Sequence, residues 1–160
     1  MPKVTLICGR ICCGKSTYAE KLRIREGAVV LSIDEIMLAM FGQHVGDMHD
    51  EYVARTEKYL FVKSLELIET GIDVILDWGF WTRDERAYAR EFYSSRNIEH
   101  EFHCVDISDA EWRLRLEKRN AAISAGVDNA NYYIDDNIAA KFGTIFEAPS
   151  ADEIDVWVRE

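Results

Sequence analysis

Residues Gly9 to Ser16 carry the strongest chemical signal in the sequence and read Gly-Arg-Ile-Cys-Cys-Gly-Lys-Ser. They complete the pattern G-x4-G-K-S between an apolar run and a helix-forming segment, which is the context that this pattern needs. Gly9 and Gly14 let the backbone curl so that consecutive N–H groups point at phosphate oxygens, and the helix start adds its positive dipole. Lys15 supplies a mobile charge for the β- and γ-phosphates, and the Ser16 hydroxyl can ligate Mg²⁺. The loop therefore predicts binding of a nucleoside triphosphate with Mg²⁺.

The other loop residues are also predicted to contact the nucleotide. Between the glycines, four residues contribute mainly their backbone groups: Arg10, Ile11, Cys12 and Cys13. Thr17, just after the loop, can help hold the α-phosphate. A thiol near a helix start can have a lowered pKa and react with oxidants. For the two cysteines of the loop we favour packing of a small side chain over such reactivity.

Two aspartates stand where predicted strands end. Asp34 follows the apolar run Val29–Ile33, and Asp77 follows the apolar run Ile72–Leu76. Ligands of α/β sheets bind at the carboxyl ends of the strands, which is also the edge from which the phosphate loop springs. An acid that ends an apolar strand holds Mg²⁺ in phosphoryl transfer, so Asp77 is a predicted metal residue, and Asp34 is the candidate base for an acceptor hydroxyl. The alternative for Asp34 is the N-cap of a helix over Glu35–Phe41, which is compatible with catalysis.

Two arginines are candidates for stabilising the charge of the γ-phosphate. Arg115 and Arg119 are four residues apart and so share a helix face. Enzymes use arginine to stabilise the negative charge that develops on the phosphate during phosphoryl transfer. We therefore assign Arg119 to catalysis and both residues to nucleotide binding. A polar stretch follows, which suggests a short lid around 115–131. Because Glu111 and Glu117 are interspersed, a solvated charged face is the alternative.

Two groups of side chains after Asp77 are open to two interpretations. The arginines that begin the next helix either bind the acceptor or stabilise a charged surface: Arg83 and Arg86. The aromatic residues that directly follow Asp77 either line the acceptor pocket or fill the core: Trp78, Phe80 and Trp81.

Strand-like and helix-like segments alternate along the chain and must position these residues. Apolar runs predict five strands, at 4–8, 29–33, 72–76, 101–107 and 154–158. Between them we predict helices at 16–26, 35–41, 51–70, 82–96 and 109–123, and a last helix that reaches about Phe146. Strands that are apolar throughout and separated by helices predict a parallel sheet covered on both faces. The predicted fold is therefore a three-layer α/β domain that spans residues 1–160.

Composition excludes several classes of protein. The chain has 29 acidic and 19 basic side chains and a net charge of −10, which disfavours nucleic-acid binding by charge alone. No apolar run approaches the length of a membrane span, and the amino terminus lacks a secretion signal, so we expect a cytoplasmic protein. The scattered cysteines predict reduced thiols rather than a zinc site. His44 and His49 are expected to lie in a solvated loop rather than to bind metal.

With these residues in hand, the chain resembles the P-loop kinase group that includes phage-type polynucleotide 5′-hydroxyl kinases, chloramphenicol phosphotransferases and zeta toxins. The resemblance covers most of the chain and implies a P-loop NTPase fold with the parallel sheet order 2-3-1-4-5. It implies that Asp34 deprotonates the acceptor hydroxyl and that Arg115 and Arg119 contact the ATP phosphates. Asp77 matches the family's acidic residue after the third strand, and Arg86 sits in a similar arginine-bearing helix start.

One departure from this group concerns the acceptor. Polynucleotide kinases place an arginine three residues after the base, and here that position is Met37. We therefore predict an ATP- and Mg²⁺-dependent kinase whose acceptor is a hydroxyl of a small molecule, such as a metabolite or an antibiotic. The alternatives are a polynucleotide 5′-hydroxyl kinase, a nucleotide-dependent switch or toxin-like protein and, more remotely, a nucleoside monophosphate kinase.

Overall fold

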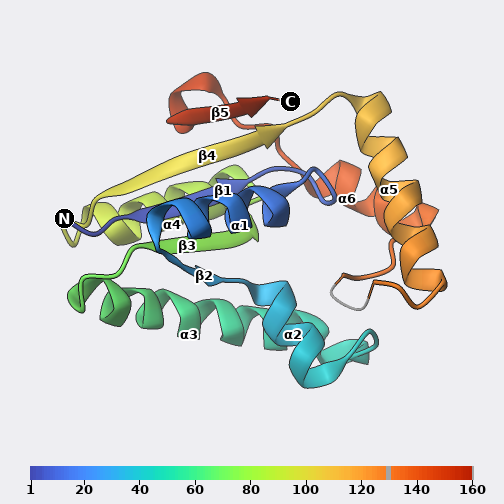
Figure 1. The fold of residues 1–160 in the computed structure, drawn as a ribbon, viewed down its shortest axis with the longest axis horizontal. Helices are drawn as coiled ribbons and strands as arrows, with labels where there is room; N and C mark the ends of the chain where they lie inside the picture. Colours follow the sequence, from blue (N-terminus) through green and yellow to red (C-terminus); the bar gives the residue numbers. More distant parts are fainter. Residues whose placement is uncertain (129–130, 160) are drawn as a thin grey trace.

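The computed structural model, which describes residues 1–128 and 131–159, contains a five-stranded parallel sheet (Figure 1). Its strands are β1 (Val4–Cys8), β2 (Val29–Leu31), β3 (Val74–Gly79), β4 (His100–Asp106) and β5 (Val156–Arg159). The order across the sheet is β2-β3-β1-β4-β5, which confirms the predicted topology. Every neighbouring pair is parallel, so the carboxyl ends of all the strands meet at one edge. In Figure 1 this edge faces α2, α5 and α6.

Helices cover both faces of the sheet. They are α1 (Lys15–Glu26), α2 (Ile33–Phe41), α3 (His49–Glu69), α4 (Arg83–Ser94), α5 (Asp109–Ser124) and α6 (Asp136–Ile145), with short 3-10 turns η1 (Gly46–Met48) and η2 (Ala151–Glu153). Residues of α3 and α4 pack on one face with Val4, Leu6 and Leu76, while residues of α1 and α5 pack on the other with Ile7 and Ile75. This alternation along β1 and β3 follows from the period of two in a strand. The predicted three-layer arrangement is therefore confirmed.

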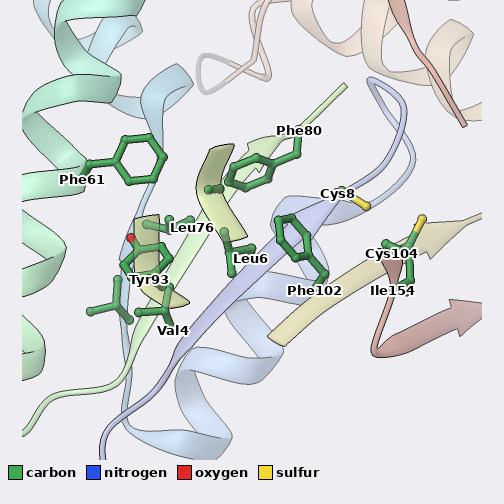
Figure 2. Packing of buried hydrophobic residues seen from close by; sticks show 12 residues of the cluster. Val4, Leu6, Cys8, Phe61, Leu76, Phe80, Tyr93, Phe102, Cys104 and Ile154 are labelled. Carbon is green, nitrogen blue, oxygen red and sulfur yellow. The ribbon is translucent and has the colours of Figure 1, made fainter. Parts of the chain in front are cut away.

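The larger core cluster ties α3 and α4 to the centre of the sheet (Figure 2). Phe61 of α3 and Tyr93 of α4 lie against β3, and both side chains are buried. The Tyr93 hydroxyl would be costly to bury alone, but it lies 2.8 Å from the hydroxyl of Ser64, so each oxygen has a partner. This packing holds α3, which precedes β3 in the chain, and α4, which follows it, against the sheet. It therefore also positions the segment between the end of β3 and α4.

Two boundaries differ from the prediction in ways that matter for the acidic residues. The strand β2 ends at Leu31 rather than at Ile33, and α2 begins directly after Ser32. The Ser32 hydroxyl accepts a hydrogen bond from the backbone N–H of Glu35, so Ser32 is the N-cap and the N-cap prediction for Asp34 is wrong. The signal was present, because a serine three residues before a glutamate is the capping-box pattern. Asp34 lies instead in the first turn of α2.

The end of β3 also differs. The strand continues to Gly79, so Asp77 lies inside β3 rather than after it. The remaining elements begin or end within a few residues of the predicted bounds. No helix in the described part of the chain is long and apolar enough to cross a membrane. Part of the predicted lid, residues 129–130, lies outside the described residues.

Candidate active site

The loop between β1 and α1 has the backbone shape that its glycines predict. Gly9 has a φ of 149° and Gly14 a φ of 100°, both in the region that favours glycine. A Cβ atom at Gly9 would lie 2.8 Å from the backbone oxygen of Val105, and one at Gly14 would lie 2.7 Å from an Nη1 atom of Arg115. The Val105 backbone oxygen therefore excludes a side chain at Gly9, whereas at Gly14 the positive φ is the reason for glycine, because the end of the Arg115 side chain can move aside.

The two polar residues at the end of the loop are held by specific hydrogen bonds. The Lys15 ammonium donates to the backbone oxygens of Gly9 at 3.1 Å and Arg10 at 2.6 Å, so it lies folded along the loop. The Ser16 hydroxyl donates to Oδ2 of Asp77 at 2.7 Å. The structure thus joins the loop to β3 through a hydroxyl and a carboxylate, an oxygen pair suited to a hard cation.

The start of α5 is fastened to the same loop. Arg10 donates to the Asp109 carboxylate at 2.6 Å and stacks over the ring of Trp112, whose indole N–H donates to the Ile11 backbone oxygen at 2.6 Å. Arg115 donates to the Cys13 backbone oxygen at 3.0 Å. The Arg10 guanidinium is therefore engaged with α5, in agreement with a mainly backbone role for this residue, and α5 carries its arginines to the edge of the loop.

Several cavities border the loop, and two of them together contain most of the predicted residues. The larger, which we call the Asp34 cavity, has a volume of about 480 Å³, and the predicted residues along its wall include Lys15, Ser16, Asp34, Asp77 and Arg119. A neighbouring cavity of about 440 Å³ is lined by Cys12, Gly14, Thr17, Arg115 and Arg119. Arg119 lines both, so it stands at the border between them. The tertiary structure therefore brings the predicted phosphate, metal and base residues into one continuous region.

Asp34 is an exposed residue that lines the cavity, and the nearby protein groups partly desolvate its carboxylate. This desolvation raises the pKa of the Asp34 carboxyl; Lys15 acts in the opposite direction, and the charge of Asp77 adds to the increase. A carboxylate with a raised pKa that lines a cavity is suited to accept a proton from a hydroxyl that binds there. The geometry therefore fits a general base.

The comparisons with known proteins agree with this arrangement. The family model AAA_33, described as an AAA domain, matches residues 4–133. The chain belongs to this AAA domain family. Its P-loop kinase-like fold accounts for the phosphate loop at the end of β1 and for the sheet order. The search of curated proteins returns no match.

Solved structures show how widely the fold of this AAA domain protein is shared. A candidate kinase of Chloroflexus aurantiacus has a TM-score of 0.72 and 14% identity over 99% of this chain and 86% of that chain. The APS kinase of Mycobacterium tuberculosis, solved with AMPPNP and APS, has a TM-score of 0.66 and 21% identity over 99% and 88%. A chain of the Pnkp1/Rnl/Hen1 RNA repair complex has a TM-score of 0.62 and 21% identity over 94% and 49%. At these identities the likeness is one of fold.

The aromatic residues after Asp77 line a cavity and also contribute to the core. Trp78, Phe80 and Trp81 all line the Asp34 cavity. Phe80 is also part of the buried core of this AAA domain protein, and Trp78 packs against it. The Trp78 indole N–H donates to the Leu31 backbone oxygen at 2.9 Å, so the side chain is fixed between β3 and β2. These rings form one rigid wall of the cavity.

Arg86 lies neither in an acceptor site nor on a charged surface, the two possibilities that the sequence left open. Its side chain is only 2% exposed, donates to the Glu153 carboxylate through Nε at 2.9 Å and donates to the Phe80 backbone oxygen through Nη1 at 2.9 Å. It therefore neither binds an acceptor nor belongs to a charged surface. Arg83, by contrast, is exposed.

The thiols of the loop are buried, as expected for packing residues. Burial raises the pKa values of Cys12 and Cys13, and the positive charges of Arg119 and Lys15 respectively oppose this increase. The structure therefore opposes the alternative of reactive, low-pKa thiols. All four cysteines are buried and reduced: Cys8, Cys12, Cys13 and Cys104.

The cavity also contains residues that sequence reasoning did not place in a site. Val53 and Glu57 come from α3, and Lys141 and Phe142 come from α6. His49 begins α3 and lines the cavity, so the expectation that it lies in a solvated loop is wrong. A signal for Glu57 existed, because it lies four residues after Val53 on the apolar face of a helix, where a carboxylate is out of place. No comparable signal marked α6, since its contacts with the site arise from the return of the chain after α5.

Proposed function

We propose that this chain is an ATP- and Mg²⁺-dependent kinase that transfers the γ-phosphate to a hydroxyl of a small molecule. The observation that carries the proposal is the meeting of the phosphate loop, the Ser16–Asp77 pair and Asp34 at one cavity of about 480 Å³. That volume lies in the range of small-molecule sites. The fold shared with an APS kinase solved with AMPPNP supports the use of a nucleotide.

In this proposal the loop of the chain holds the triphosphate. The backbone N–H groups of the loop face the β-phosphate, and Lys15 moves from the backbone oxygens of Gly9 and Arg10 to the phosphates. Arg119 neutralises charge on the γ-phosphate from the border of the two cavities, while Arg115 and Thr17 lie on the side of the α-phosphate. Residues 125–128, in the described part of the polar segment after α5, belong to the proposed lid.

Ser16 and Asp77 are the residues that would hold Mg²⁺, because they present two oxygens 2.7 Å apart beside the loop. Among the described residues no group of three His, Cys, Asp or Glu side chains could hold a metal ion. Phosphate oxygens and water would therefore supply the other ligands, as is usual for Mg²⁺. When bound, the ion would neutralise the charge on the β- and γ-phosphates.

The proposed transfer is a direct displacement. The acceptor oxygen forms a bond to the γ-phosphorus while the bond from that phosphorus to the β–γ bridging oxygen breaks, and ADP leaves with the electron pair. The hydroxyl proton passes to the Asp34 carboxylate. Met37, which stands where polynucleotide kinases carry an arginine, is fully buried against Ile33 and Leu60. It therefore offers no cation to a phosphate on the acceptor, which supports a small acceptor over a nucleic acid.

The test is transfer of label from γ-labelled ATP with Mg²⁺ to two acceptor sets. One set contains hydroxyl-bearing metabolites and antibiotics, and the other contains 5′-hydroxyl DNA and RNA oligonucleotides. We expect label on a member of the first set. Label on the oligonucleotides alone would establish the polynucleotide kinase alternative, and ATP binding without transfer to either set would favour a nucleotide-dependent switch.

The raised pKa of Asp34 predicts the pH dependence of this activity. A general base acts when deprotonated, so kcat/KM should fall as the pH decreases through the pKa of Asp34. Because desolvation raises that pKa, the midpoint should lie above about 3.9, the ordinary value for aspartate. The measurement is a pH–rate profile with saturating Mg²⁺ and ATP. An acidic limb of the same midpoint in the Asp34→Asn variant would contradict the assignment.

A further inference from the structure

The wall of the Asp34 cavity away from the phosphate loop is rich in carboxylates. Asp50 and Glu57 of α3 and Glu85 of α4 all line it. Once Lys15 and Arg119 are assigned to the triphosphate, the other lysine or arginine on this wall, within the described residues, is Lys141. Its side chain is exposed, and no ion pair joins it to these acids in the described part of the chain. The acceptor end of the cavity is therefore negative.

Glu57 differs from the other acids of its helix. On α3, Glu51 pairs with Arg55 and Glu66 pairs with Lys63, and these pairs lie at the surface. Glu57 is half-buried, and among residues 1–128 and 131–159 no side chain or backbone group is placed to hydrogen-bond to its carboxylate. Burial, and then the nearby charge of Glu85, raises the pKa of Glu57. The fold thus partly desolvates a carboxylate beside a like charge, which is unfavourable unless a cation joins it.

The same wall also contains several aromatic rings. Trp78 and Trp81 line the same cavity, and the ring of Phe142 meets that of Trp81 edge to face with centroids 4.5 Å apart. Aromatic faces attract organic cations, and they favour an ammonium group over a strongly hydrated metal ion. Carboxylates beside aromatic rings are therefore the chemistry that recognises a protonated amine.

We propose that the acceptor is a hydroxyl compound that also carries a protonated amine, such as an amino sugar or an amino alcohol. Glu57 binds the ammonium group, Glu85 adds to the negative potential and the tryptophan rings line its path. This proposal rests on the proposed function, since the same cavity then presents the hydroxyl of the compound to Asp34. The amine takes no part in the transfer and serves only recognition.

The test uses acceptors that differ only in the charge of the amine. Free amino sugars, aminocyclitols and amino alcohols are each paired with their N-acetylated forms, which keep the hydroxyl groups and lose the charge. Neutral sugars and polyols form a third set. We expect transfer of label from γ-labelled ATP to a free amine, with kcat/KM about 10- to 100-fold lower for its N-acetylated partner, the size expected for loss of one hydrogen bond to a charged group.

A substitution then tests whether Glu57 is the residue that recognises the ammonium group of the acceptor. Glu57→Gln should raise the KM of the amine acceptor about 10- to 100-fold and change the KM of neutral acceptors little. Glu69→Gln is the matched control, because it removes the same charge from an exposed position of the same helix. An equal rise in KM for both variants, or for both kinds of acceptor, would contradict specific recognition by Glu57.

The outcomes separate this inference from the proposed function. Transfer to neutral or N-acetylated compounds in preference to free amines would overturn the inference and leave the proposed function standing. Binding of a free amine in the presence of AMPPNP, with no transfer to any acceptor, would support the charge preference and overturn the proposed function. If no set binds or receives label while ATP still binds, both are overturned.

Discussion

Asp34→Asn is expected to lower the rate of phosphate transfer about 10²- to 10⁴-fold, the usual contribution of a positioned general base. An asparagine amide keeps the size of the side chain but cannot accept the hydroxyl proton at neutral pH. ATP affinity should change little, because the predicted phosphate contacts come from the loop, Lys15 and Arg119 rather than from α2. The measurements are AMPPNP binding by calorimetry and transfer of label at saturating ATP.

The control for this prediction is Glu35→Gln. It removes a carboxylate one position along α2, at an exposed residue that does not line the Asp34 cavity but lines a neighbouring cavity of about 750 Å³ that Asp34 also lines. We expect near-normal transfer from this variant. Equal losses of AMPPNP binding and transfer in Asp34→Asn would mean that Asp34 supports nucleotide binding or folding, and the assignment as a base would then be wrong.

Arg86→Met is expected to be the most destabilising substitution among the charged residues discussed. The change leaves the Glu153 carboxylate, which is 15% exposed, without its ion-pair partner and removes the donor to the Phe80 backbone oxygen. Breaking a buried pair by removing one partner costs about 3–5 kcal/mol. For a chain of this size that corresponds to a fall in Tm of roughly 10 °C. Urea denaturation and calorimetry measure both quantities.

Arg83→Met provides the matched control, since it makes the same substitution at an exposed position of the same helix. Its free energy of unfolding should stay within about 0.5 kcal/mol of the unsubstituted protein, as for most surface changes. Similar values for the two variants would show that the Arg86–Glu153 pair contributes no more than a surface charge.

The same pair predicts a loss of stability in acid. Burial opposes ionisation of Glu153, but hydrogen bonds from Arg86 and from Ser150 outweigh it and lower the pKa of Glu153 to about 2, from an ordinary value of 4.5. A lowered pKa in the folded state stabilises the fold above the unfolded pKa. This contribution should therefore be complete above about pH 4.5 and disappear as the pH falls towards 2, and Glu153→Gln should remove it at neutral pH.

Arg86 also bears on the geometry of the cavity. The Phe80 residue that it holds has a φ of 45°, an unfavourable value for a residue with a side chain. The hydrogen bond from Arg86 to the Phe80 backbone oxygen, together with burial of the Phe80 ring, keeps this turn at the end of β3. We therefore infer that the Arg86–Glu153 pair positions the aromatic wall rather than any reacting group.

The sequence alone was sufficient for the fold class and the phosphate loop, because both depend on local signals. The sheet order came from the resemblance to the P-loop kinase group, and the structure confirms it. Apolar runs of strand length are buried on both faces. The loop needs glycines at fixed offsets because Gly9 and Gly14 both have a positive φ, and a Cβ atom at Gly9 would lie within 3 Å of a backbone oxygen. The sequence also marked Asp34 and Asp77, since both stand near the ends of apolar strands at the binding edge. Their catalytic and metal roles remain predictions.

Only the tertiary structure decided which side chains share the cavity with Asp34. Glu57 and Phe142 lie 85 residues apart in the chain, and the packing of α3 and the return of α6 bring both to the same wall. The structure also separated Arg86 from the surface arginines, because a partner 67 residues away buries it. Contacts between distant segments have no local signature, since they depend on how whole helices pack. The sequence motif therefore located the phosphate loop, and long-range packing determined which other residues line the Asp34 cavity.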